Sequence, residues 1–89
     1  MKIEIRWVDA WCYDGHSWTD NETYLKDKVE VGKGEDAVSV FRKWLENKSK
    51  VVAAGLADGG YVLVDEGDCI ELRVTHNGMP FYRATVIEA

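Results

Sequence analysis

Two cysteines and two histidines are the residues of this sequence best suited to bind a metal. Cys12 and His16 are separated by three residues, and Cys69 and His76 by six. Four such side chains are sufficient for a tetrahedral zinc site. However, residues seven positions apart on a strand point to opposite faces and lie about 23 Å from each other. We therefore expect no metal site, and we expect two reduced cysteines that pack as small apolar side chains.

The first cysteine and histidine could instead form a catalytic pair. Cys12 with His16, oriented by Asp9 or Asp14, has the residue types of a nucleophile and its base. No Gly-rich elbow or helix N-terminus lies beside the cysteine to activate the thiol. A small enzyme or ligand-binding domain that uses Cys12, His16 and the nearby acids is therefore an alternative. It requires the two side chains to lie within hydrogen-bond reach of each other.

Acidic residues dominate two windows of the sequence. Residues 7–25 contain four acids and residues 51–72 contain five, and neither window has a Lys or Arg. Asp65, Glu66 and Asp68 crowd a single turn, but a glycosidase pair needs a cleft, and a calcium loop needs a different spacing. We interpret these acids as solvated charges that attract a basic partner surface.

Aromatic residues are concentrated in the first of these windows. Residues 7–24 hold five of the ten aromatic side chains: Trp7, Trp11, Tyr13, Trp18 and Tyr24. Trp7 alternates with charged residues and is expected in the core. Trp18 lies among polar residues, where it either folds back over the core or stands exposed as a binding anchor. The predicted partner-binding residues are the aromatic anchors and the flanking acids, namely Tyr13, Asp14, Trp18, Asp20, Asp65, Glu66 and Asp68.

Length and composition restrict the class of protein. The 89 residues form one domain, residues 1–89, with 46% hydrophobic residues and a net charge of −5. An acidic surface repels phosphate, so we expect no direct binding to nucleic acid. No apolar run approaches the roughly 20 residues of a membrane span, and no secretory signal is visible, which predicts a cytoplasmic protein.

The alternation of apolar residues predicts an α+β fold. Residues 2–8 form a strand, and the alternation breaks near Asp9 through a bulge or through burial of both faces. A polar connection over residues 14–22 leads to a second strand at 23–31. A helix follows with Asp36 as its N-cap, while residues 51–56 read equally as helix or strand. Further strands are predicted at 61–64, 69–76 and 81–87.

The connections between these elements favour an antiparallel sheet. Asn77-Gly78 predicts a hairpin, and Pro80 suggests that the last strand lies at an edge. The expected order is β-β-α-β-β-β, a mostly antiparallel sheet with one helix packed on one face. An edge strand at 81–87 would also permit a homo-dimer or larger homo-oligomer, and a structural homo-oligomer is a further alternative for the function.

The aromatic segment also carries a resemblance. Trp11-Cys-Tyr13-Asp-Gly15, then Trp18, Asn21 and Tyr24, then a short helix and an Asn-Gly hairpin, resembles small proteins encoded by phages and prophages. Within that setting the chain is similar in size and charge to anti-defence proteins, of which anti-CRISPR proteins are the best-known group. The resemblance implies a non-enzymatic inhibitor that docks on a basic, nucleic-acid-binding surface of a host defence protein. The resemblance carries over no site residue, because that group shares no common site. We expect no cofactor.

Overall fold

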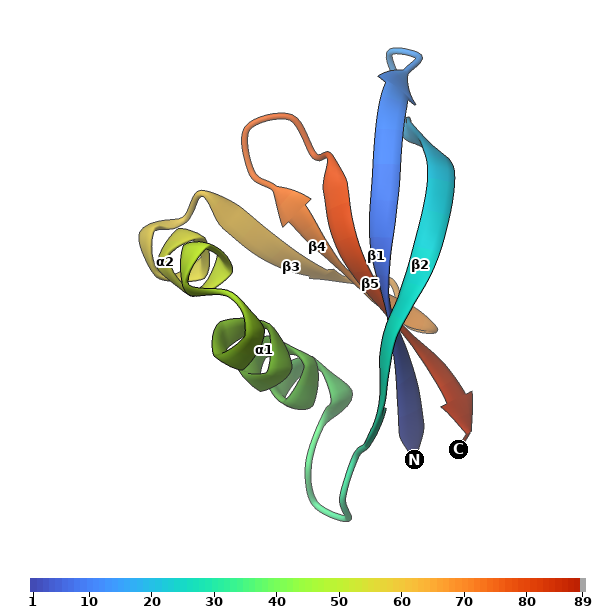
Figure 1. Cartoon of the computed structure of the whole chain (residues 1–89), viewed down its shortest axis with the longest axis vertical. Helices are drawn as coiled ribbons and strands as arrows, with labels where there is room; N and C mark the ends of the chain where they lie inside the picture. Colours follow the sequence, from blue (N-terminus) through green and yellow to red (C-terminus); the bar gives the residue numbers. More distant parts are fainter. Residues whose placement is uncertain (89) are drawn as a thin grey trace.

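The computed structural model describes residues 1–88 as an α+β fold with a single five-stranded sheet (Figure 1). The strands lie in the order β2-β1-β5-β4-β3, and every neighbouring pair is antiparallel. The elements are β1 (Lys2–Tyr13), β2 (Trp18–Glu30), α1 (Ala37–Lys48), α2 (Lys50–Asp58), β3 (Tyr61–Asp65), β4 (Cys69–Val74) and β5 (Pro80–Glu88). The antiparallel α+β class is as predicted, but the chain has two helices where the sequence predicted one.

Capping residues explain where the two helices begin. The Asp36 carboxylate accepts hydrogen bonds from the backbone N–H of Ser39, at 3.1 Å, and from its hydroxyl, at 2.8 Å, as predicted for an N-cap. Ser49 ends α1 and also begins α2, because its hydroxyl oxygen accepts from the N–H of Val52 at 3.1 Å. The ambiguous residues 51–56 therefore lie within a helix. Neither helix has the length and apolar character needed to cross a bilayer.

A glycine in α2 allows this short helix to pack closely on β3. A Cβ atom on Gly55 would lie 2.6 Å from Cε2 of Tyr61 and closer still to Cδ2. Glycine normally weakens a helix, and here its missing side chain makes room for the aromatic ring. The Tyr61 and Phe81 rings also pack in a T-shaped arrangement, with ring centroids 5.5 Å apart.

Both helices cover one face of the sheet, and the main core lies between the helices and this face. Phe41 and Leu45 of α1 meet the strand residues Ile3, Ile5 and Leu72, all of which are less than 2% exposed. Val31, Val52, Leu56, Ile70 and Ala84 complete this cluster. Strand alternation places Arg6, Glu71 and Arg83 on the opposite face, which no helix of residues 1–88 covers and which we call the open face.

The hairpin of β1 and β2 extends beyond the rest of the sheet. β1 pairs with β5 only from Lys2 to Trp7, so residues 8–23 pair only with one another. We call residues 8–23 the arm, and its upper part stands clear of both helices (Figure 1). The turn covers only residues 14–17, so the predicted connection over 14–22 is wrong. Asp and Asn are uncommon in strands, which is why the pattern indicated a loop, but strand preference depends on cross-strand neighbours that the sequence does not show.

Three register shifts bend this hairpin, and one of them confirms the bulge predicted near Asp9. That shift leaves Asn21 as an extra residue on β2, and a second leaves Trp11 as an extra residue on β1. An extra residue reverses the in–out alternation beyond it, which places Tyr13 opposite Trp18. Before the bulge, Val8 and Ala10 are buried on the open face, outside the main core. β1 therefore has buried side chains on the helix-covered face, at Ile3 and Ile5, and further along the strand on the open face, at Val8 and Ala10.

The last strand lies in the centre of the sheet and not at an edge. β5 pairs with β1 on one side and with β4 on the other, so the predicted edge position of residues 81–87 is wrong. Pro80 is tolerated because it is the first residue of the strand. The Asn77-Gly78 hairpin is confirmed, with Gly78 at φ 74°. Lys2 pairs with Glu88, so the start of β1 and the end of β5 lie side by side, away from the arm (Figure 1).

Candidate functional site

The tip of the arm holds the aromatic pair that the sequence singled out. Tyr13 and Trp18 face each other across the hairpin, with ring centroids 5.3 Å apart. The indole N–H of Trp18 donates a hydrogen bond to the carbonyl oxygen of Asn77 at 3.0 Å, which ties the tip to the β4–β5 turn. Trp18 is half-buried, whereas Tyr13 is 55% exposed. Trp18 is therefore neither folded into the core nor fully exposed. Its ring packs against Tyr13 and remains partly accessible to solvent.

Asp14 organises the turn that joins Tyr13 to Trp18. One carboxylate oxygen accepts hydrogen bonds from the backbone N–H groups of His16, at 2.8 Å, and Ser17, at 2.9 Å. These hydrogen bonds, that from Ser17 first, hold the pKa of Asp14 below its ordinary value. The carboxylate is exposed and forms no ion pair with the described residues 1–88. The tip therefore presents a fixed negative charge beside an exposed phenol ring.

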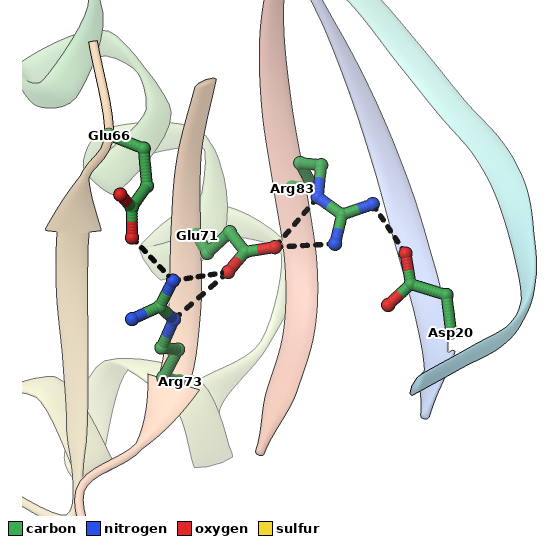
Figure 2. Close-up of polar contacts among 5 residues, drawn as sticks. All are labelled: Asp20, Glu66, Glu71, Arg73 and Arg83. Atoms are coloured by element: carbon green, nitrogen blue, oxygen red, sulfur yellow. Dashed lines mark hydrogen bonds and ion pairs between the residues drawn. The ribbon is translucent and has the colours of Figure 1, made fainter. Parts of the chain in front are cut away.

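A chain of five charged side chains crosses the open face (Figure 2). Its central member is Glu71, which is only 8% exposed. One Glu71 oxygen accepts from Nε and Nη2 of Arg73, at 2.9 and 2.7 Å. The other accepts from Nε and Nη2 of Arg83, at 2.7 and 2.5 Å. At the two ends, Arg83 donates to Asp20 and Arg73 donates to Glu66, each at 2.7 Å.

The electrostatics of this chain keep both guanidinium groups charged. The hydrogen bond to Asp20 is the main reason that the pKa of Arg83 is raised, and Glu71 adds to it. Burial alone lowers the pKa of Arg73, but the hydrogen bonds to Glu71 and Glu66 outweigh it, so the net shift is upward. Asp20 and Glu66, both predicted as free partner-binding acids, are thus neutralised in part by arginines of the same chain.

The arm tip and the open face enclose a pocket of about 340 Å³. Its walls combine rings, a histidine and charged groups: Tyr13, His16, Ser17, Trp18, Asp20, Glu71, Arg73, Asn77, Gly78, Pro80 and Arg83. Four of the seven predicted site residues contribute to the tip region, and three of these line the pocket. The four donated hydrogen bonds occupy both oxygens of Glu71, so the pocket floor is an internally compensated ion-pair network and not a free charged site.

The remaining predicted acids lie elsewhere. Asp65 is the last residue of β3 and Asp68 lies in the β3–β4 turn, at the end of β4 opposite the Asn77 turn. A six-residue strand is about 20 Å long, so these two acids are separated from Trp18 by roughly that distance. Asp65 accepts a hydrogen bond from the backbone N–H of Gly67 at 2.8 Å. The structure thus connects only Glu66 of this turn to the arm, through the ion-pair chain.

The cysteine and histidine residues are not assembled into a site. Cys12 is exposed, and no hydrogen bond joins it to His16 in the range 1–88. Cys69 is half-buried on β4. Within the same range, no three His, Cys, Asp or Glu side chains are grouped closely enough to hold a metal ion.

Sequence reasoning missed the three residues at the centre of the ion-pair chain. Alternation along residues 69–76 predicts only that Glu71 and Arg73 face outward, and Arg83 is an isolated charge of the strand predicted at 81–87. The alternation of charged and apolar residues is visible in the sequence, but the register that places Glu71 directly opposite Arg83 depends on the β4–β5 pairing.

Comparison of the chain with protein-family models, with curated proteins and with solved structures finds no match.

Proposed function

We propose that this protein is a non-enzymatic interaction module that docks on a basic surface of a partner protein through the tip of its arm. The observation that carries this proposal is the exposed Tyr13 ring, which packs on Trp18 and lies beside Asp14, whose carboxylate has no ion-pair partner among residues 1–88. Rigid aromatic side chains with adjacent polar groups are the usual anchors of protein interfaces. The arm projects them away from the helices, where a partner surface can reach them (Figure 1).

The distribution of ion pairs decides which acids can attract the partner. Asp20 and Glu66 are already bound to Arg83 and Arg73. Asp14, Asp65 and Asp68 have no such cation in residues 1–88 and keep their full charge for an outside partner. We place Asp14 at the contact, and we assign Asp65 and Asp68 to longer-range steering of the encounter.

A narrower form of the proposal concerns the identity of the partner. The resemblance to small phage proteins supports a phage-encoded inhibitor, and the net charge of −5 supports a target whose basic surface normally binds nucleic acid. In this form the protein acts by occupying that surface in place of the nucleic acid. Competition between this protein and a nucleic acid for the captured partner would support it.

The test uses the triple variant D14N/D65N/D68N. Asparagine can accept the same turn hydrogen bonds as Asp14 and Asp65, so the variant removes charge while keeping the local structure. Wild-type protein is used to capture a partner from a lysate of the source cells, and affinities are then measured by calorimetry over a range of salt concentrations. We expect about tenfold weaker binding by the variant and a smaller salt dependence.

The matched control is the triple variant E35Q/E46Q/D58N, which removes the same charge from the helical side of the molecule. It should bind the partner nearly as tightly as the wild type. A second variant, Y13A, should weaken binding without changing the salt dependence, because it removes a ring and no charge. Equal affinity of the wild type, D14N/D65N/D68N and Y13A for the captured partner would reject the proposal.

A further inference from the structure

Two acids face each other directly on the arm. Asp9 of β1 is paired with Glu22 of β2 in the register of the hairpin. Directly opposed residues of an antiparallel pair have Cβ atoms about 4.5–5.5 Å apart, and like charges in this position destabilise the hairpin. Neither carboxylate forms an ion pair with any Lys, Arg or His in residues 1–88. This contrasts with the open face, where every carboxylate of the chain in Figure 2 is bound by an arginine.

Neutral neighbours hold both carboxylates in place. The side-chain amide of Asn21, the extra residue of the bulge, donates to Oδ2 of Asp9 at 3.0 Å. The hydroxyl of Tyr24 donates to Oε2 of Glu22. Each acid therefore keeps its second oxygen without a hydrogen-bond partner in the described part of the chain. The bulge and the tyrosine orient the acids without neutralising them.

An aromatic pair adjoins these acids on the same face of the β1–β2 hairpin, at the base of the arm. Tyr24 lies directly opposite Trp7, and their ring centroids are 5.4 Å apart at an angle of 32°. Tyr24 is 44% exposed. Alternation along β2 puts Tyr24 and Glu22 on one face, and both side chains are exposed. The face thus presents two oriented carboxylates and the exposed ring of Tyr24.

We infer that this face binds an arginine side chain of the partner polypeptide. A planar guanidinium can donate to two carboxylates at once and can stack on an aromatic ring, and a compact ammonium matches this arrangement less well. An arginine between Asp9 and Glu22 would also remove the repulsion that the free hairpin carries. The inference rests on the proposed function and deepens it, because it names the group on the basic partner and a second face of the arm that receives it.

The test follows the binding of a defined peptide by NMR. Isotope-labelled protein is titrated with acetyl-Gly-Arg-Gly-amide, and with acetyl-Gly-Gln-Gly-amide as the uncharged reference. We expect the arginine peptide to shift the amide signals of Asp9, Glu22 and Tyr24 most, and the glutamine peptide to leave them unchanged. In the variant D9N/E22Q, binding should be about tenfold weaker. The variant E35Q/D58N removes the same charge from the helical side of the molecule, where each side chain accepts only a local backbone hydrogen bond, and should retain the wild-type shifts.

A second measurement does not depend on the peptide. If the two acids repel each other in the free protein, D9N/E22Q should unfold at a higher temperature than the wild type, because it removes this repulsion. Peptide shifts centred away from Asp9 and Glu22, or shifts unchanged in D9N/E22Q, would overturn the inference, as would a lower unfolding temperature of the variant. Loss of partner capture in D14N/D65N/D68N together with unchanged capture in D9N/E22Q would overturn this inference alone and leave the proposed function intact.

Discussion

The carboxylate of Glu71 accepts two hydrogen bonds from the Arg83 guanidinium with one oxygen, while its other oxygen is bound by Arg73. Glu71 is 8% exposed, on a sheet face that the helices leave uncovered. The side chains of Arg73 and Arg83 cover Glu71, as apolar side chains cover most other buried residues of the protein. Through the two arginines Glu71 connects β2, β4, β5 and the β3–β4 turn, so one carboxylate organises the whole open face.

Replacing this carboxylate should destabilise the fold. In E71Q, two guanidinium groups lose their shared counter-charge and keep only weaker neutral hydrogen bonds. We expect a loss of roughly 2 kcal/mol in the free energy of unfolding, less than for a fully buried pair because both arginines are partly exposed. Urea unfolding followed by circular dichroism measures it. D68N, which changes a nearby exposed acid, should leave the unfolding curve in place, and an equal effect of both substitutions would contradict this assignment.

Gly55 should not tolerate a side chain, although alanine is the better helix former. The added methyl group of G55A would overlap the Tyr61 ring, so we expect a net loss of about 1–3 kcal/mol in the free energy of unfolding. The control places the same change in a Y61L background, where the ring is gone. There G55A should be neutral or stabilising, since helix propensity then dominates. A similar loss in both backgrounds would show that the ring is not the cause.

The fold class could be predicted because local signals agree with it. Strand alternation, the Asp36 cap and the Asn77-Gly78 turn each act over a few residues, and each is found in the structure. The second helix could not be predicted, because Gly55 weakens any helical pattern unless its contact with Tyr61 is known. The central position of β5 also escaped prediction, since the strand order depends on long-range pairing that hairpin signals do not encode.

The acidic pair on the arm predicts a gain in stability on neutralisation. D9N and E22Q should each raise the free energy of unfolding by about 0.5 kcal/mol, because each removes the same repulsion. The double variant should gain less than the two single gains added together, which identifies the effect as a coupling. Thermal unfolding of the four proteins completes the cycle. Additive gains would show that the two charges do not interact.

The two cysteines should differ in reactivity. Burial, followed by the negative charge of Glu71, raises the pKa of the Cys69 thiol, so little thiolate is present near neutral pH. Cys12 is exposed. We expect iodoacetamide to modify Cys12 about ten times faster than Cys69, with the sites assigned by mass spectrometry in C12S and C69S variants. In concentrated urea the two rates should converge, and a persistent difference there would assign the effect to the local sequence.

The N-cap of α1 should make stability depend on pH in the acid range. The hydrogen bonds from Ser39 hold the pKa of Asp36 below its ordinary value of 3.8. A carboxylate with a lowered folded pKa stabilises the fold fully above the unfolded value, and this stabilisation is lost as the pH falls through the folded value. The advantage of the wild type over D36A should therefore be constant above about pH 5 and shrink below about pH 4. D36N keeps a cap that does not titrate, so its advantage over D36A should not change with pH.

The candidate site could be located from the sequence only as a segment. The clustering of rings and acids in residues 7–24 pointed to the arm. The use of each side chain there depends on two bulges, at Trp11 and Asn21, because each reverses which residues share a face. Tyr13 and Trp18 meet only after the bulge at Trp11, and Asp20 is bound by an arginine 63 residues away. Such relations arise from the pairing of strands and have no local signature.

The pairing of Lys2 with Glu88 has a practical consequence for how the molecule can be handled. The start of β1 and the end of β5 lie at one pole of the molecule, and the tip of the arm occupies the other (Figure 1). A tag, a dye or a linker to a sensor surface can therefore be joined to either end without covering the tip. Molecules immobilised in this way would all present the arm outward, so that measured affinities would report on one uniformly oriented surface.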